Sequence, residues 1–338
     1  MVVQPDPGKP NERRHRSEPL LRDIYIADPS AHLFEGRIYV YGSHDIDGTT
    51  PEDDLGSHFE MRDYQVISMD RVGGEVTIHE VALDVDDVPW ASRQMWAPDA
   101  ATKNGRYFLY FPAKDHEGVF RIGVATADRP EGPFRAEPEP IKGSHSIDPA
   151  VFTDDDGASY MYFGGIWGGQ LQRWTMGHYD PNGSKTDLEQ DEQPALNPRV
   201  ARLTDDMLEF AEPPREALIL DEKGFPLLGG DHDRRFFEAA WIHKHAGQYY
   251  LSYSTGDTHY LTYATSTSPY GPFTYRGRIL EPVQGWTTHH SILQVAEQWY
   301  LFYHDTQLSN RTHLRNAKVT ELTHRPDGTI EVIDPFLR

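Results

Sequence analysis

The sequence predicts an all-β protein, and within that class a five-bladed β-propeller. Three observations support this fold. An aromatic, alternating strand pattern recurs five times along the chain, one polar residue precedes each repeat at an equivalent place, and the composition favours short strands joined by tight turns. Repeats separated by tens of residues are typical of propellers, in which each repeat forms one blade.

The composition agrees with many short strands in one large domain. The chain has 338 residues, with 28 Gly, 25 Pro and 12% aromatic residues. This length allows a substantial core in one large domain or in two ordinary ones. Glycine, proline and aromatic residues at this level favour strands and turns over a helical bundle. Because no stretch has the composition of a linker, we expect no second domain.

Five segments carry the repeated strand pattern. In each of them a turn is followed by aromatic and aliphatic residues that alternate with a period of two, which indicates a β-strand. The five segments are 36–44, 105–111, 157–163, 247–253 and 297–304.

A polar residue lies in an otherwise apolar stretch upstream of every repeat. The five residues are Asp28, Asp99, Asp148, Glu238 and His289. The innermost strand of each blade lines the axis of a propeller, so equivalent residues from all blades face one small central space. The sequence therefore predicts that these residues, far apart along the chain, gather at the axis.

The boundaries follow from the polar segments between the repeats. Met1 to Glu18 is polar and basic, which predicts a flexible N-terminal arm before a catalytic propeller domain of residues 19–338. The two longest gaps hold predicted insertions, Asp45 to Met61 and Tyr179 to Val200, which would rim the axis or lie on the outside. We expect Thr329 to Ile333 to close the last blade by pairing with an early strand.

The chain is strongly acidic. Its 53 Asp and Glu residues against 32 Lys and Arg give a formal net charge of -21, which would repel nucleic acids and anionic membrane surfaces. No run of about 18 apolar residues could span a bilayer, and the N-terminal segment lacks the apolar centre of a signal peptide. We therefore expect a cytoplasmic protein with no nucleic-acid or membrane partner. The absence of cysteine excludes disulfides and thiolate chemistry, and the oligomeric state stays open.

Three of the five equivalent positions hold carboxylic acids: Asp28, Asp148 and Glu238. If these acids share one pocket, their charges raise one another's pKa values, and at least one of them holds a proton near neutral pH. Inverting glycoside hydrolysis needs this arrangement, because one acid protonates the leaving oxygen while an ionised carboxylate activates a water.

The local surroundings of the acids favour different roles. Glu238 has the longer side chain and the more apolar neighbours, so we expect it to be the general acid. Asp28 lies in a turn beside a proline and a serine, which favours an ionised general base. Asp148 would lie near Glu238, hold the pKa of that residue up and orient it. A single acid of this kind is more often structural and bonds the amides of a turn, and we expect that role for Asp99.

Five motifs, in this order and each ahead of an aromatic strand, resemble those of glycoside hydrolase family 43. They are Asp28-Pro29, Trp96-Ala-Pro-Asp99, Ser146-Ile-Asp-Pro149, Phe237-Glu-Ala-Ala-Trp-Ile-His243 and Thr288-His-His-Ser-Ile292. The resemblance extends over nearly the whole chain. It implies a five-bladed propeller that inverts configuration, with the base at Asp28, the pKa modulator at Asp148 and the acid at Glu238. It also implies an exo-acting enzyme of the β-xylosidase and α-L-arabinofuranosidase type, whose pocket accepts one pentose.

The resemblance gives roles to residues around the acids as well. In similar proteins the histidine that matches His289 binds a divalent cation, commonly Ca²⁺, on the axis; the alternative is a neutral histidine that holds a core hydrogen bond. Because Ca²⁺ prefers oxygen, water would have to fill most of its shell. Arg315 matches an arginine that reaches towards the substrate and the acids. Trp96 would offer an apolar wall to a sugar ring, although most tryptophans in propellers pack blades together.

The sequence thus predicts an inverting, exo-acting hydrolase that needs no organic cofactor. It would release a terminal pentose from xylo-oligosaccharides as a β-xylosidase, with α-L-arabinofuranosidase side activity. An α-L-arabinofuranosidase or an arabinan-degrading enzyme is the nearest alternative, because xylose and arabinose are both pentoses. A non-catalytic sugar-binding propeller would not need three converging acids. An enzyme of the invertase-like group would retain configuration, but the Trp-Met-Asn-Asp-Pro start of that group is missing from this sequence.

Overall fold

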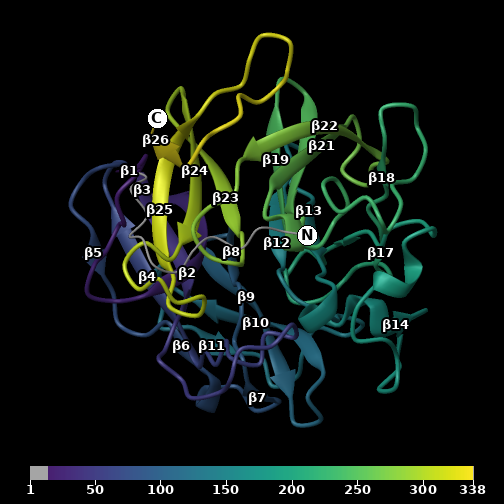
Figure 1. Cartoon of the computed structure of the whole chain (residues 1–338). Coiled ribbons are helices and arrows are strands. Elements are labelled where there is room, and N and C mark those ends of the chain that lie inside the picture. The colour runs from purple at the N-terminus through teal and green to yellow at the C-terminus, as the bar shows by residue number, and fades with distance from the viewer. Residues whose placement is uncertain (1–13, 338) are drawn as a thin grey trace.

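The five predicted repeats form five β-sheets arranged around a central axis. The computed structural model describes residues 14–337. Figure 1 shows the blades following one another around the axis in chain order, from purple through teal and green to yellow. The predicted five-bladed β-propeller is therefore confirmed. Within residues 14–337, no helix has the length and apolar character needed to cross a membrane.

The first two blades come from the N-terminal part of the chain. Blade 1 consists of β2 (Ile26–Phe34), β3 (Arg37–His44), β4 (Asp63–Met69), β5 (Thr77–Ile78) and β6 (Leu83–Asp84). Blade 2 consists of β8 (Asp99–Lys103), β9 (Arg106–Asp115), β10 (Phe120–Ala127), β11 (Arg135–Ala136) and the short β7 (Ala91–Arg93). A 3-10 turn, η1 (Val85–Asp87), connects them.

The other three blades complete the ring. Blade 3 consists of β12 (Ala150–Thr153), β13 (Ser159–Phe163), β16 (Arg199–Arg202) and β17 (Arg215–Glu216). Blade 4 consists of β18 (Ile219–Leu220), β19 (Glu238–His245), β20 (Gln248–Ser254), β21 (Leu261–Ser266) and β22 (Phe273–Leu280). Blade 5 consists of β23 (His290–Val295), β24 (Gln298–Asp305) and β25 (Asn316–Leu322). Short elements between them are β14 (Trp174–Thr175), β15 (His178–Tyr179), η2 (Trp167–Gly169), η3 (Leu171–Arg173), η4 (Leu188–Gln190) and η5 (Gly256–Thr258).

The aromatic repeats are the second strands of the blades, namely β3, β9, β13, β20 and β24. Each pairs with the inner strand on one side, and each of the five polar positions lies within two residues of the start of an inner strand. The inner strands of neighbouring blades also touch around the axis, since β2 packs against β23, β12 against β8 and β19, and β19 against β23. The polar positions thus share the centre of the ring because the blades repeat with the same strand order.

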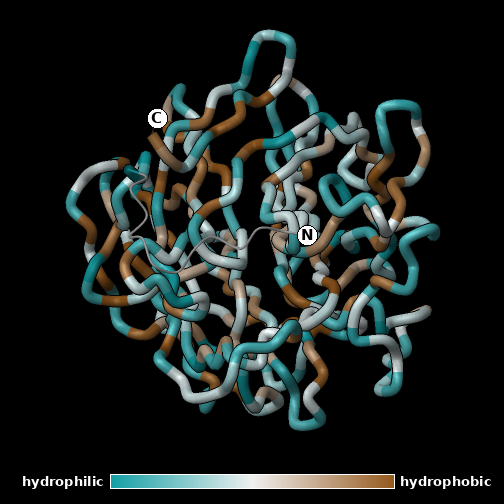
Figure 2. The backbone as a smooth tube through the Cα atoms, viewed as in Figure 1, coloured by the Kyte–Doolittle hydropathy of each residue, from teal (hydrophilic) through white to brown (hydrophobic). Residues whose placement is uncertain are grey.

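The core is distributed over the interfaces between blades. The aromatic and aliphatic side chains that alternate along each strand pack face to face with those of the next blade, and Figure 2 shows this alternation as changes between brown and teal along the strands. Separate buried clusters join blades 1 and 2 around Phe111, blades 2 and 3 around Met161, and blades 3 and 4 around Leu251. Two more clusters join blades 4 and 5 around Leu301, and blades 5 and 1 around Phe302.

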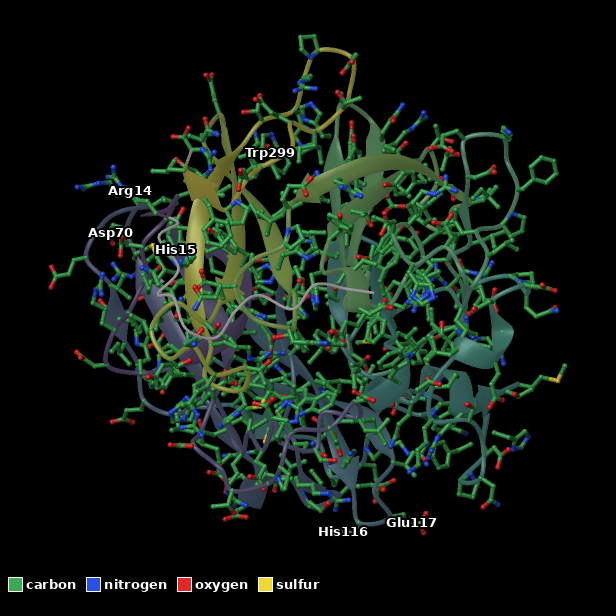
Figure 3. All side chains as sticks on the ribbon, in the orientation of Figure 1. Arg14, His15, Asp70, His116, Glu117 and Trp299 are labelled. Carbon is green, nitrogen blue, oxygen red and sulfur yellow. The ribbon has the colours of Figure 1, made fainter. Side chains whose placement is uncertain are left out.

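The ring is closed by the two ends of the described chain. The short strand β1 (Arg14–His15) pairs antiparallel with β26 (Phe336–Leu337), and Figure 1 shows both strands at the same edge of the molecule, where Figure 3 labels Arg14 and His15. Arg14 and His15 therefore belong to the folded part of the chain, although the sequence predicts a flexible arm over residues 1–18. Residues 1–13 of that arm lie outside the described residues.

The prediction that Thr329 to Ile333 pairs with an early strand is wrong. Ile333 instead forms a parallel bridge with Leu280, the last residue of β22 in blade 4. A pairing with β1 begins only three residues later, at Phe336. A short apolar segment can form a strand, but its residues do not specify which strand it pairs with.

Candidate active site

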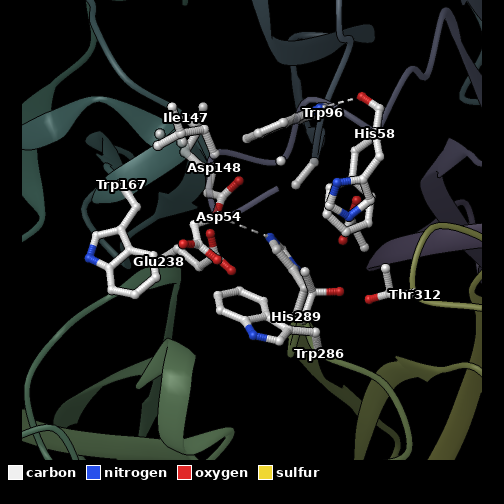
Figure 4. Close-up of a pocket in the computed structure, with 18 of the residues that line it drawn as sticks. Asp54, His58, Trp96, Ile147, Asp148, Trp167, Glu238, Trp286, His289 and Thr312 are labelled. Atoms are coloured by element: carbon white, nitrogen blue, oxygen red, sulfur yellow. Dashed lines mark hydrogen bonds and ion pairs between the residues drawn. The ribbon is translucent and has the colours of Figure 1, made fainter. Parts of the chain in front are cut away.

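A pocket of about 240 Å³ lies where the inner strands of the blades begin. This is smaller than the roughly 300–1,000 Å³ of pockets that take drug-sized ligands, and it suits one sugar ring. All six site residues predicted from the sequence line it: Asp28, Trp96, Asp148, Glu238, His289 and Arg315. In Figure 4 the side chains of Asp148, Glu238 and His289 point towards one another.

Backbone irregularities aim the acids into the pocket. Between Ala27 and Ser30, β2 has one residue more than the facing part of β3. Between Glu238 and Trp241, β19 likewise has one residue more than the facing part of β20. Such bulges turn a side chain out of the regular alternation of a strand. Asp28 and Asp148 also have left-handed φ angles of +52° and +56°, a conformation that aspartate tolerates better than most residues.

Asp28 is held as a carboxylate. Its Oδ1 accepts a hydrogen bond of 2.9 Å from Nη1 of Arg315, and its Oδ2 accepts one of 2.7 Å from the Ser43 hydroxyl. Burial by itself would raise the pKa of Asp28, but the Arg315 charge and the His304 ring together outweigh burial and hold this pKa below its ordinary value. The backbone N–H of Asp28 donates to Nδ1 of His304 over 3.0 Å, which fixes the position of the bulge.

Asp148 and Glu238 interact with each other, and both of their pKa values are raised, in contrast to the pKa of Asp28. Burial and the charge of Asp28 raise the pKa of Glu238 to about 8. Burial and the neighbouring charge of Glu238 raise the pKa of Asp148 as well. Oδ2 of Asp148 accepts a hydrogen bond of 2.8 Å from the backbone N–H of Ala239, directly beside Glu238. Two neighbouring acids in one pocket titrate as a unit, so the pair retains a proton at neutral pH.

The side chain of Glu238 is the one of this pair that remains partly open to the pocket. Asp148 is 4% exposed, whereas Glu238 is only half-buried. A proton shared by the pair can therefore reach a bound ligand through Glu238. This geometry supports the different roles that the sequence predicts for the two acids.

His289 provides unused nitrogen atoms at the centre. Neither ring nitrogen has a hydrogen-bond partner among the described residues, and Nε2 lies 3.9 Å from Oδ2 of Asp148. Burial lowers the pKa of His289 to about 4, so the ring is neutral at ordinary pH and keeps a lone pair available. The alternative expectation, a histidine engaged in a core hydrogen bond, is not what residues 14–337 show. The neighbouring His290 does have that role, since its Nε2 meets the Ser252 hydroxyl at 2.6 Å.

Trp96 forms an apolar wall of the pocket. Its Nε1 donates to the backbone carbonyl of Phe59 over 2.9 Å, and its ring packs edge-on against Phe59 and tilted against Phe120. Two further tryptophans, Trp167 and Trp286, line the pocket on the other side, with ring centroids 6.4 Å apart. Figure 4 shows these two rings flanking Glu238.

The predicted insertion at residues 45–61 reaches the axis. Glu52 to Gly56, His58, Phe59 and Met61 all line the pocket. The second predicted insertion, residues 179–200, does not line it but supports it from behind, because Asp187 accepts a hydrogen bond of 2.8 Å from Nε1 of Trp167. The first insertion thus lines the pocket directly, and the second supports one of the residues that line it.

Asp99 lies outside the pocket and ties three blades together. Its Oδ1 accepts hydrogen bonds from the Ser30 hydroxyl at 2.5 Å and from Nε2 of His32 at 2.7 Å, both in blade 1. Its Oδ2 accepts one of 2.5 Å from the backbone N–H of Val151 in blade 3. This placement agrees with the structural role expected for Asp99.

Sequence reasoning missed Asp45 and Ser43. Asp45 holds the guanidinium of Arg315 through two side-chain hydrogen bonds, and Ser43 donates to Asp28. Ser43 is the penultimate residue of β3 and Asp45 follows that strand, so neither occupies one of the five equivalent positions beside the inner strands. The available signal was two polar residues, Ser43 and Asp45, at the end of an otherwise apolar strand beside the pocket.

Comparison with known proteins identifies the family. The model of glycosyl hydrolases family 43 matches residues 68–330. A xylosidase/arabinosidase 43A from Humicola insolens is 58% identical, over 94% of this chain and 99% of that protein. A β-xylosidase from Xylanibacter ruminicola is 51% identical, over 91% of this chain and 97% of that protein.

Solved structures agree. The crystal structure of a family-43 β-xylosidase/α-arabinofuranosidase from a compost microbial metagenome, in complex with xylotriose and in a calcium-free form, is 66% identical, with a TM-score of 0.94 over 96% of this chain and 100% of that one. A family-43 enzyme from Xanthomonas citri in complex with xylotriose is 58% identical, with a TM-score of 0.89 over 95% and 94% of the two chains. This chain is an enzyme, a glycoside hydrolase, and it belongs to family 43.

Proposed function

We propose that this enzyme is an exo-acting β-xylosidase that inverts configuration and has α-L-arabinofuranosidase side activity. The observation that carries the proposal is the opposite ionisation of the acids in one small pocket. Asp28 is held as a carboxylate by Arg315, while the Asp148 and Glu238 pair retains a proton. Inverting glycosidases need an ionised base and a protonated acid at the same time.

Glu238 acts as the general acid. Its raised pKa keeps a proton available at neutral pH, and its side chain is open to the pocket. Proton transfer to the glycosidic oxygen breaks the bond to the leaving sugar, and Glu238 is left as a carboxylate. Burial and the charge of Asp28 favour the protonated form of Glu238, and Asp148 anchors the start of β19 through the backbone of Ala239.

Asp28 acts as the general base. Its ionised side chain accepts a proton from a water, whose oxygen forms the new bond to the anomeric carbon from the face opposite the leaving group. Because the bond that breaks and the bond that forms lie on opposite faces of the ring, the sugar is released with inverted configuration. The hydrogen bonds from Ser43 and Arg315 keep Asp28 ionised until it accepts this proton.

The pocket size and the relatives support a terminal pentose as the substrate. A volume of about 240 Å³, closed on one side by Trp96 and the 52–61 segment, suits one ring at the non-reducing end of a chain. Relatives that match nearly the whole chain are described as xylosidase/arabinosidase or β-xylosidase, and two matching structures hold xylotriose. We therefore infer xylo-oligosaccharides as the natural class of substrate.

Two assays test the proposed function. p-Nitrophenyl β-D-xylopyranoside should be hydrolysed faster than p-nitrophenyl α-L-arabinofuranoside, measured side by side as kcat/KM. Proton NMR of xylobiose hydrolysis should show α-xylose as the first product. First-formed β-xylose would indicate retention and contradict the roles given to Asp28 and Glu238, whereas a faster arabinoside would change only the preferred sugar.

We also propose that His289 holds a divalent cation, Ca²⁺, on the axis. Its two unpartnered ring nitrogens and its neutral state fit a metal ligand. Residues 14–337 contain no group of three or more His, Cys, Asp or Glu side chains that could hold a metal, so water would complete the shell. A bound cation would supply positive charge near the three acids. Chelation should lower kcat and Ca²⁺ should restore it; an unchanged rate after both steps would contradict the proposal.

A further inference from the structure

The guanidinium of Arg315 has two faces with different partners. Its Nε and Nη2 donate to Asp45 over 2.9 and 2.7 Å, as a two-pronged ion pair, and the Arg315 backbone N–H donates to the same carboxylate over 2.7 Å. Its Nη1 is directed the other way, to Asp28 at 2.9 Å and to the Thr287 hydroxyl at 3.3 Å. The ring of Phe59 lies 4.7 Å from the guanidinium carbon. Arg315 therefore has little freedom to rotate.

Asp45 itself does not line the pocket. It is 3% exposed, and its backbone N–H donates to the carbonyl of Tyr25 over 3.0 Å. The residue follows directly after His44, the last residue of β3. A buried carboxylate is costly unless it is paired, and here the pair is formed with a residue that contacts the general base. Asp45 is therefore connected to Asp28 through Arg315.

We propose that Asp45 is a positioning residue, which holds Arg315 in the one orientation that presents Nη1 to Asp28. A two-pronged arginine–carboxylate pair fixes the plane of the guanidinium, as a single contact would not. The three atoms Asp45 Oδ1, Asp45 Oδ2 and Asp28 Oδ1 thus form a frame around one cation. This inference rests on the proposed role of Asp28 as the base.

The test is the pair of variants Asp45→Asn and Arg315→Lys, alone and combined. Asn cannot accept from both Nε and Nη2, so Arg315 loses its orientation. We expect Asp45→Asn to lower kcat on p-nitrophenyl β-D-xylopyranoside by about 10- to 100-fold, with a smaller change in KM. In the Arg315→Lys background the same substitution should lower kcat by less than about threefold, because the group that Asp45 orients is already gone. Equal effects in both backgrounds would overturn the inference.

The pH profile separates orientation from simple charge. If Arg315 is displaced, Asp28 becomes easier to protonate, and the acidic limb of kcat/KM moves to higher pH. If Asp45 acted only through its negative charge, which disfavours ionisation of Asp28, its removal would move this limb to lower pH. A shift to lower pH, or no shift, would contradict the proposal.

Two controls complete the experiment. Asp63→Asn removes a nearby carboxylate that pairs with Nδ1 of His44 at 2.8 Å outside the pocket, and it should leave kcat within about twofold of the wild type. Asp28→Asn, measured in parallel, tests the proposed function itself: an active variant would contradict the base, whereas an inactive one beside an unaffected Asp45→Asn would contradict only the present inference. If Asp45→Asn does not fold by circular dichroism, Asp45→Ser replaces it with the same expected results.

Discussion

At the residue scale, neighbouring charges decide the chemistry of the acids. Asp28 and Asp148 share the same residue type, the same left-handed backbone and a following proline. Their pKa values nevertheless move in opposite directions, because Arg315 contacts Asp28 at 2.9 Å while Glu238 lies beside Asp148. Burial alone would have left both protonated. Arg315 and His304 beside Asp28, and Glu238 beside Asp148, therefore give the two aspartates different pKa values.

The alkaline limb of the activity profile should lie near pH 8. Glu238 must be protonated to act, and its pKa is raised to about 8. We expect kcat/KM to be constant at neutral pH and to fall as pH rises through this value. The pH dependence of kcat/KM is measured from initial rates on p-nitrophenyl β-D-xylopyranoside, corrected for the ionisation of p-nitrophenol. An alkaline limb with its midpoint below pH 6 would contradict the raised pKa of Glu238. Circular dichroism at each pH checks that the loss of activity is not caused by unfolding.

Glu238 should also make folding depend on pH. Its pKa is about 8 in the folded chain and 4.5 as an ordinary glutamate, so the folded state binds the proton more tightly. The stability that results is full below pH 4.5 and is lost as pH rises through about 8. Glu238→Gln removes this loss, so we expect the variant to gain free energy of unfolding over the wild type as pH rises from 5 to 8. Urea unfolding at several pH values measures the difference, and a constant difference would contradict the expectation.

At the element scale, two segments from different blades meet to close the pocket. Residues 52–61, between β3 and β4, touch η2, which follows β13. An added Cβ on Gly168 in η2 would lie 2.4 Å from the carbonyl oxygen of Leu55. Because a backbone atom cannot move aside cheaply, the two segments can approach this closely only with glycine at that place.

Gly168→Ala should therefore disturb the pocket more than the fold. The new methyl group pushes residues 52–61 away, so we expect KM for p-nitrophenyl β-D-xylopyranoside to rise by about tenfold with a smaller change in the melting temperature. Gly73→Ala is the matched control, because nothing lies within 4 Å of its Cβ, while its left-handed φ of +75° adds backbone strain. The control should lower stability without changing KM. The same KM in both variants would contradict the closing role of Leu55.

At the scale of the whole molecule, the ring depends on how its ends are joined. Lys318 in β25 is completely buried and donates to Asp305 over 2.6 Å, and His15 in β1 lies 3.2 Å from the same carboxylate. Asn316 donates to the other oxygen of Asp305 at 2.7 Å. This buried ionic group connects strand β1 to blade 5. Blade 5 has three strands, fewer than each of the other four blades.

Lys318→Met should weaken this closure. Asp305 would keep a buried charge without its cation, and breaking a buried ion pair on one side reduces stability by about 3–5 kcal/mol. Urea unfolding followed by tryptophan fluorescence measures the change. Lys244→Met is the control, because that lysine pairs with Asp154 and Asp155 near the surface, and its loss should be clearly smaller. A Lys318→Met variant as stable as the wild type would show that the closure rests on other contacts.

The sequence alone predicted the fold class and the meeting of three acids in one pocket. Strand periodicity and a polar residue before each repeat are local features, so five blades, the aromatic second strands and the convergence of Asp28, Asp148 and Glu238 could all be inferred from residue spacing. Trp96 and His289 also lie in the pocket as predicted. A repeated fold makes long-range contacts predictable, because each blade places its residues as the previous one does.

The tertiary structure decided what the repeat does not encode. Asp45 and Arg315 are 270 residues apart and occupy no equivalent blade positions, so their ion pair could not be inferred from spacing. The same holds for the pairing of Arg14 and His15 with Phe336 and Leu337, since the sequence assigned Arg14 and His15 to an arm. Partners of this kind depend on which surfaces meet after the ring closes. The residue types fixed which groups could ionise, and only their neighbours in the folded ring determined which of them do.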